Sequence, residues 1–416
     1  MCFQEDGEHE PVDLGPAEAP ARQASNLFAY LSAKIPGGQA DGRPGDDDAE
    51  RREQGRAKGR EVCQHGAALT GVSMDDLEVW FDKGVTDGLP VVPPTRERVT
   101  LMLAGTARDR AELVGEVAPN YGRATVEKVA VNAVMAGCRP DYLPVVLAAV
   151  EAACDPAFNL HGMSTSTHFS APLIVVNGPI RERVGLNCSF GVFGPGHRAN
   201  ATIGRALRLV MINLGGAKPG ETSMSTFGHP GRYTYCIGEF EEKSPWPPYH
   251  VERGFGPEES TVTVFAGEAP HGISDHASRT ARSLAGSLGW SMCGLWNIKH
   301  FPLYSHTMLV VGPEHARTLG DDGWSKADLK RHLFETVRVP YRTLLPDAEN
   351  GEGTNLRFTK GREPGLEELI PKFPSVEEIH VVVAGGTAGR FSMAVAGWLG
   401  TKNGSTPITV PVRNIP

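Results

Sequence analysis

The chain has 416 residues, of which 40% are hydrophobic and 22% charged, and its 41 basic and 49 acidic residues leave a net charge of −8. These values are typical of a globular protein that can bury a sizeable core, and the lack of a long basic stripe argues against nucleic acid as a partner. Seven scattered cysteines, none spaced as Cys-x-x-Cys, argue against a disulfide framework and a structural zinc site.

Residues 1–72 are predicted to form a disordered tail. They are rich in Ala, Gly, Pro and charged residues, and cannot bury enough apolar surface to offset their ordering entropy. An alternative is that this tract is a mis-extended start and that the native chain begins at Met74. The N-terminus lacks the basic and apolar regions of a signal peptide, and no apolar run reaches 18 residues, so we expect a cytoplasmic protein with no membrane partner.

Helical patterns start directly after this tail. Ser73 and Thr95 are predicted N-caps, and Gly137 and Gly215 stand where a glycine favours the end of a helix. Residues 198–214 carry apolar side chains at helical spacing, which predicts an amphipathic helix. The predicted helices cover residues 75–81, 95–103, 124–136, 142–153, 198–214, 275–288 and 325–338.

Three short apolar runs are predicted strands buried on both faces, namely residues 173–176, 308–311 and 380–383. A Gly-bearing turn and a helix-compatible segment follow each run. Residues 233–240 and 261–265 alternate in polarity as exposed strands do. Together these patterns predict an α/β fold, a mixed sheet with helices on both faces.

The tracts 171–180 and 306–315 are similar, since each runs from an apolar strand into a turn containing Gly-Pro. This similarity predicts two related half-units, a first α/β unit over residues 73–255 with Gly-rich central loops and a second over residues 256–416. A strand followed by Gly-Pro also recurs by chance in α/β proteins, which is the alternative.

The pattern Met-Ser-Thr-x-x-His occurs twice in the polar central stretch, over residues 163–168 and 224–229. Imidazoles titrate near neutrality and hydroxyls can act as nucleophiles, so the pattern indicates acid–base or nucleophilic chemistry. The alternative is that these residues cap turns and bond buried carbonyls. The predicted catalytic residues are His168, His229, Ser164, Ser225 and, as a candidate reactive thiol, Cys188.

A divalent transition metal is one candidate cofactor, and a metal-bound water would become a nucleophile near neutral pH. The candidate ligands are His168, His229, Glu239 and His250. No His-Glu-x-x-His or other familiar metal spacing is present, so the cofactor stays open.

Two Gly-rich loops are candidate sites for an anionic substrate. One loop, residues 193–200, opens the amphipathic helix, where Asn200 is the predicted N-cap and Arg198 the predicted contact to the anion. The other contains Gly385 and Gly386, with Arg390 adding positive charge. A plain tight turn is the alternative for the second loop, which matches no nucleotide-binding pattern.

Four segments of residues 74–416 resemble a poorly characterised bacterial family associated with selenoproteins that carry a Sec-Gly-Ser-Cys motif. They are Asp87-Gly-Leu-Pro-Val-Val-Pro-Pro-Thr95, residues 124–138, residues 194–205 and Asp322-Gly-Trp-Ser-Lys326. The resemblance implies thiol or selenol redox chemistry, or cleavage of a carbon–heteroatom bond. The chain departs from the family pattern, because it lacks Sec-Gly-Ser-Cys and has Phe391 where the family has His.

The sequence therefore favours a small-molecule enzyme, a hydrolase or lyase assisted by His and Ser and optionally by a metal. Its expected substrate is an anionic small molecule. Whether the chain assembles as a homo-oligomer is left open by the sequence. Two alternatives remain open. One is a redox enzyme that works with a thiol or selenol, and the other is a non-catalytic paralogue that acts as a binding or scaffold subunit.

Overall fold

A computed structural model describes residues 74–296, 305–345, 364–400 and 404–415. The tail predicted for residues 1–72 lies outside these residues. Residues 80–416 belong to one compact unit.

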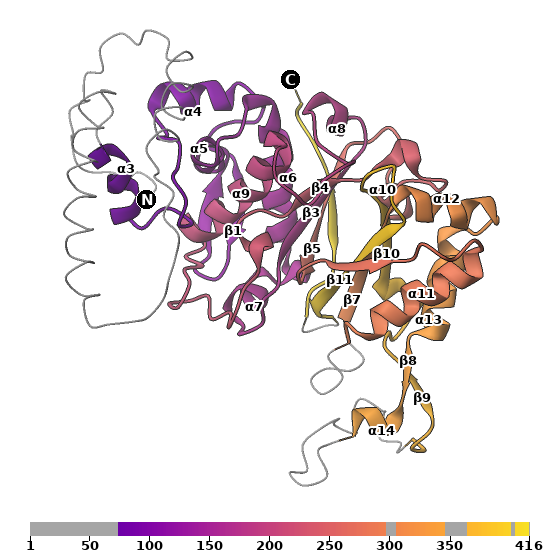
Figure 1. Ribbon diagram of the computed structural model, residues 1–416. Helices are drawn as coiled ribbons and strands as arrows, with labels where there is room; N and C mark the ends of the chain where they lie inside the picture. The colour runs from indigo at the N-terminus through magenta and orange to yellow at the C-terminus, as the bar shows by residue number, and fades with distance from the viewer. Residues whose placement is uncertain (1–73, 297–304, 346–363, 401–403, 416) are drawn as a thin grey trace, which may run out of the picture. The chain divides into compact units, whose positions relative to one another are not determined.

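The core of this unit is an eight-stranded mixed sheet with the strand order β10-β7-β11-β5-β3-β4, in which β12 also pairs with β5 and β6 with β11 (Figure 1). Its strands are β3 (Ala171–Asn177), β4 (Cys236–Gly238), β5 (Thr261–Gly267), β6 (His271–Ser274), β7 (Ser305–Val311), β10 (Ile379–Val383), β11 (Phe391–Leu399) and β12 (Ile408–Pro411). Two small antiparallel pairs stand apart, β1 (Leu113–Val117) with β2 (Gly122–Thr125), and β8 (Arg338–Pro340) with β9 (Leu369–Pro371).

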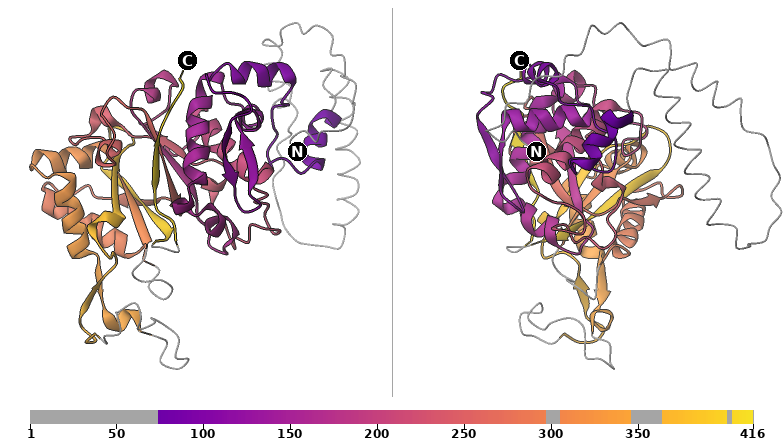
Figure 2. Two further views of the ribbon diagram at one scale, coloured as in Figure 1. Left: turned by 180° about the vertical axis from the view of Figure 1, so that it is seen from behind. Right: turned by 90° about the vertical axis from the view of Figure 1, so that its left-hand side faces the viewer.

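Helices cover the two outer faces of this arrangement, as both views in Figure 2 show. The longer ones are α4 (Arg96–Leu103), α5 (Val126–Ala136), α6 (Leu143–Cys154), α9 (Arg198–Asn213), α11 (Ala281–Cys293), α12 (Pro313–Asp321) and α13 (Lys326–Thr336); α3 (Met74–Asp82) precedes them in the chain. The shorter ones are α7 (Leu160–Thr165), α8 (Ile180–Arg183), α10 (Tyr249–Glu252), α14 (Tyr341–Leu344), and the 3₁₀ turns η1 (Pro140–Tyr142), η2 (Pro156–Phe158), η3 (Pro230–Arg232), η4 (Glu241–Lys243) and η6 (Val376–Glu378).

Local sequence explains where several helices begin and end. The hydroxyl of Thr125 accepts from Lys128 N–H at the start of α5, and Gly137 ends that helix with φ 88°, a conformation that glycine adopts without a side-chain clash. The helix predicted for residues 325–338 is present as α13, which opens with a capping box in which Ser325 and Asp328 bond each other's backbone.

Alternating residues of the strands face different hydrophobic cores. Ile174 and Val176 of β3 pack with α5, α6 and α9, whereas Leu309 and Val311 of β7 pack with α11, α12 and α13. The residues between them, such as Val175 and the corresponding residues of β7 and β10, share a third core between the two halves of the sheet. The predicted mixed sheet with helices is confirmed, and the helices lie on its outer faces.

The two halves of the sheet have the same internal arrangement. In one half β3 has a parallel partner, β4, and an antiparallel partner, β5; in the other, β7 has a parallel partner, β10, and an antiparallel partner, β11. The equivalent strands β5 and β11 join the halves through the pair Gly267–Gly397. The related tracts 171–180 and 306–315 therefore occupy equivalent places.

Two predictions about strands were wrong. Residues 261–265 were expected to form an exposed strand, but every residue of β5 is buried, because it lies inside the sheet between two hydrophobic cores. Of residues 233–240, only the buried segment β4 is a strand. In addition, β5 and β12 belong to the same half of the sheet as β3, so the chain after residue 255 contributes to both halves.

Within the described ranges, no single helix has the length and apolar composition needed to cross a membrane. A pair of segments bent by 69°, residues 140–154 and 156–165, meets that criterion jointly, and most of α6 is buried in the protein core.

Candidate functional site

The two Met-Ser-Thr-x-x-His tracts meet in the folded chain. Thr226 of the second tract donates two hydrogen bonds to the carbonyl oxygen of Thr167 in the first, from its backbone nitrogen at 2.9 Å and from its hydroxyl at 3.1 Å. The first tract ends just before β3, and the second ends just before η3. The structure therefore brings together two tracts separated by about sixty residues of sequence.

Both histidines adopt the same local geometry. The backbone N–H of Ser170 donates to Nδ1 of His168 at 3.3 Å, and the backbone N–H of Gly231 donates to Nδ1 of His229 at 3.1 Å. An Nδ1 atom that accepts a hydrogen bond carries no proton, so the proton of each neutral ring lies on Nε2. The repeated motif thus builds two turns that each present an Nε2–H group.

Nε2–H of His168, the first of these groups, faces the carboxylate of Glu268, a residue that no sequence pattern indicated. Its Oε1 lies 3.1 Å from Nε2 of His168, and both side chains are largely buried. The contact results from strand register, because Ala171 at the start of β3 pairs with Gly267 at the end of the antiparallel strand β5. No local signal in the sequence marks this pairing.

In the described part of the chain, the Nε2 atom of His229, unlike that of His168, is not paired with a carboxylate. Burial lowers the pKa of His229, the Gly267 carbonyl opposes that shift, and the positive charge of Arg232 adds to it, so the ring is neutral at pH 7. Its Nε2 has no hydrogen-bond partner of normal geometry among the described residues, and the same is true of the Ser225 hydroxyl. This Nε2 atom is buried, and the Gly267 carbonyl is the backbone acceptor that acts on the ring.

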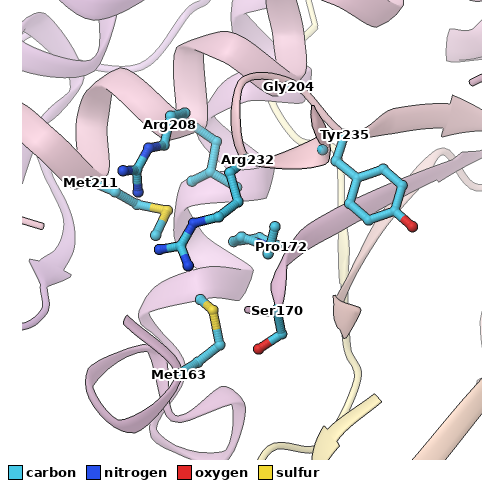
Figure 3. Close-up of a pocket in the computed structure, with 11 residues that line it drawn as sticks. Met163, Ser170, Pro172, Gly204, Arg208, Met211, Arg232 and Tyr235 are labelled. Carbon is cyan, nitrogen blue, oxygen red and sulfur yellow. The ribbon is translucent and has the colours of Figure 1, made fainter. Parts of the chain in front are cut away.

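His229 and Ser225 line a cavity of about 920 Å³, which is large enough for a small-molecule ligand. Charged side chains on its wall include Asp87, Arg208, Lys218 and Arg232. Arg208 and Arg232 also line an adjoining narrow pocket together with Ser170 and Met163 (Figure 3). Ser164 is buried in α7 with an unsatisfied hydroxyl and lines neither space.

The four candidate metal ligands do not assemble into one site. Parallel strands β3 and β4 place His168, which precedes β3, and Glu239, which follows β4, at opposite ends of the sheet. Glu239 accepts hydrogen bonds from Asn177 at 2.6 Å and from the backbone of Tyr249 at 2.7 Å, and His250 lies 3.1 Å from the Gly256 carbonyl. In the part of the chain that is described, no group of three His, Cys, Asp or Glu side chains is placed to hold a metal ion.

The candidate thiol also lies at the far end of the strands. The Cys188 carbonyl accepts from Gly385 N–H at 2.9 Å. Burial raises the pKa of the Cys188 thiol, although Arg181 opposes the shift. A raised pKa leaves less thiolate at pH 7, which is the opposite of what a reactive cysteine requires.

The predicted anion contacts at the start of α9 are occupied by the protein itself. The helix begins at Arg198, so the N-cap is His197 and the prediction of Asn200 was wrong. Arg198 Nε donates to the Gly137 carbonyl at 3.0 Å. The buried amide of Asn200 bonds the backbone of Asn187 and Cys236 instead.

Gly385 and Gly386 line a second, apolar cavity of about 290 Å³. Arg390 is used structurally, since it donates to the carbonyls of Asp275 and Ser278. Beside it, His315 lies 2.8 Å from the Ser392 hydroxyl and 3.1 Å from the Asp275 carbonyl. Both ring nitrogens of this buried histidine have hydrogen-bond partners, whereas only Nδ1 of His229 has a partner of normal geometry among the described residues.

Comparison with known proteins adds no assignment, because no family model, curated protein or solved structure matches this chain.

Proposed function

We propose that this protein is a small-molecule hydrolase or lyase whose active site is the cavity beside the two Met-Ser-Thr-x-x-His tracts. The observation that supports this proposal most directly is that the two tracts meet beside a cavity large enough for a substrate, whose wall includes His229 and Ser225. Cavities of this size with a few polar groups on their walls are typical of sites that bind a ligand.

In this proposal His229 acts as a neutral hydrogen-bond donor. Its Nδ1 is occupied by Gly231 N–H, so Nε2–H is the group that would turn from the Gly267 carbonyl to a substrate and stabilise negative charge that develops on oxygen. The Ser225 hydroxyl is a second polar participant at the same wall. Neither role requires a metal ion.

His168 and Glu268 form the neighbouring acid–base pair. The Glu268 carboxylate accepts from Nε2–H of His168 and is the acceptor group beside His229 in this proposal. Its negative charge raises the pKa of His229. Hydrolysis and elimination both need a proton acceptor and a donor, which this arrangement supplies.

Turnover can be tested without a known substrate by incubating the full chain with a panel of small esters, hydroxy acids and phosphorylated metabolites and following products by mass spectrometry. We expect His229→Gln to reduce turnover of any substrate found at least about 100-fold, the usual scale for loss of one oxyanion donor. His271→Gln, at an exposed histidine of β6, is the control. Full turnover in both His168→Gln and His229→Gln would refute the placement of the active site.

A further inference from the structure

Two arginines, Arg208 of α9 and Arg232 of η3, extend next to each other at the cavity wall (Figure 3). Arg208 is only 9% exposed. Its Nη2 makes one long hydrogen bond, 3.4 Å to the Ala217 carbonyl. Arg232 donates to the Ser223 hydroxyl at 2.8 Å, and its Nη1 is buried with no partner within the described ranges.

The buried Arg181 and the half-buried Arg205 are paired with carboxylates. Arg181 contacts Glu241 at 3.0 Å and Glu242 at 2.8 Å, and Arg205, one turn before Arg208 in α9, forms two 2.8 Å bonds to Asp87. Across the described residues, neither Arg208 nor Arg232 has an ion pair with a carboxylate. The fold therefore leaves two neighbouring guanidinium groups without a direct ion pair among the described residues, although Asp87 and Glu221 line the same cavity.

Such an arrangement is unfavourable in the empty protein. Burial and the charge of Arg232 together lower the pKa of Arg208 to about 10, whereas the charge of Asp87 opposes the shift. Removing two like charges from water costs free energy that the hydrogen bonds to Ala217 and Ser223 offset only in part. An anion between the guanidinium groups would remove that cost.

We propose that Arg208 and Arg232 together bind an oxyanion group of the substrate, a phosphate or a carboxylate. The planar guanidinium group suits both, because it can donate two parallel hydrogen bonds to their oxygens. Ser225 lines the same cavity as the two arginines and is a further polar residue on its wall. This inference rests on the proposed function only for the chemistry that follows binding.

The surroundings further define the substrate. Met163, Met211 and Pro172 line the narrow pocket next to the arginines, and His229 lies on the wall of the larger cavity. The narrow pocket holds only about 10 Å³, so we expect a small molecule that lies in the larger cavity, with its anionic group at the arginines and its reacting group near His229.

Binding can be measured by calorimetry on the full chain with inorganic phosphate and, separately, malonate as probes. The stronger probe identifies the kind of anion. We expect Arg208→Met and Arg232→Met each to weaken binding of that probe at least about tenfold, since hydrogen bonds to charged groups are among the strongest in proteins. Arg317→Met removes a positive charge from an exposed side chain and should leave binding unchanged.

Thermal unfolding without any anion separates a binding role from a structural one. Arg208→Met and Arg232→Met should raise the midpoint of unfolding, because each removes a buried charge that has no partner. Arg181→Met should lower it, because Glu241 and Glu242 lose their partner. Failure of both probes to bind, or a lowered midpoint in both Arg208→Met and Arg232→Met, would overturn the inference.

His229→Gln distinguishes this inference from the proposed function. If the variant binds phosphate or malonate normally but retains full turnover, the catalytic role of His229 is wrong and the anion site stands. If the variant loses turnover while the wild-type protein binds neither probe, the anion site is wrong and the catalytic proposal stands.

Discussion

Asn200 shows at the scale of a residue how a polar side chain near a candidate loop can serve structure. Its buried amide accepts from Asn187 N–H at 2.8 Å and donates to the carbonyls of Asn187 at 2.8 Å and Cys236 at 3.2 Å. All three partners of this amide are backbone groups of the protein. The Asn200 side chain therefore links α9 to the preceding loop and to β4 by hydrogen bonds, and has no free group for a substrate.

We expect Asn200→Ala to lower the free energy of unfolding by about 2 to 3 kcal/mol, because three hydrogen bonds are lost and buried backbone groups are left unsatisfied. Chemical denaturation would measure this change. Binding of phosphate or malonate by the folded variant should be unchanged. Asn120→Ala, at an exposed position, is the control.

At the scale of elements, the decisive contact is the junction between β5 and β11. Gly267 and Gly397 pair there, and neither position has room for a side chain. A Cβ on Gly397 would lie 2.6 Å from the His306 carbonyl oxygen, and one on Gly267 would lie 2.7 Å from a methyl group of Val395. The close approach of the two halves of the sheet therefore depends on glycine at both positions.

Gly397→Ala should destabilise the protein by about 1 to 3 kcal/mol, the usual cost of forcing an extra methyl group into a packed core. The neighbouring atom is backbone, which cannot move aside as a flexible side chain can. Gly272→Ala, in strand β6 with open space around the added methyl, should change stability little. Equal stability of the two variants in urea denaturation would contradict this account of the junction.

For the whole molecule, buried histidines between the two halves make stability depend on pH. His306 and His380 lie 3.0 Å apart, and the Tyr249 hydroxyl lies 2.9 Å from the other nitrogen of His380. Burial lowers the pKa of His306 from 6.5 to about 4. The unfolded chain therefore binds a proton below pH 6.5 that the folded protein does not bind until about pH 4.

Stability should consequently fall as the pH drops from 6.5 towards 4. His306 alone would contribute a loss of about 2 kcal/mol between pH 6.5 and pH 5, at about 1.4 kcal/mol per pH unit. Denaturation at pH 7 and pH 5 should show a shallower dependence in His306→Gln than in the wild type. An exposed histidine variant, His271→Gln, should keep the wild-type slope.

Local sequence determined the strands β3, β7 and β10, the helices α5, α9 and α13, and the equivalence of the tracts 171–180 and 306–315. These features follow from residue periodicity, capping side chains and glycine turns, all of which act over a few neighbouring residues. The Met-Ser-Thr-x-x-His repeat also indicated where polar groups gather. It did not indicate which ring nitrogen is free, since that depends on backbone contacts in the folded chain.

Tertiary structure alone decided which residues share a site. Register between β3 and β5 brings Glu268 to His168, while the parallel direction of β3 and β4 separates Glu239 from both repeated histidines. Arg208 lies within the helical pattern of residues 198–214. Its sequence neighbours do not reveal that its side chain is buried without a carboxylate in direct ion-pair contact. Pairing and counter-ions are long-range properties, so they depend on how distant segments pack rather than on the residues next to them.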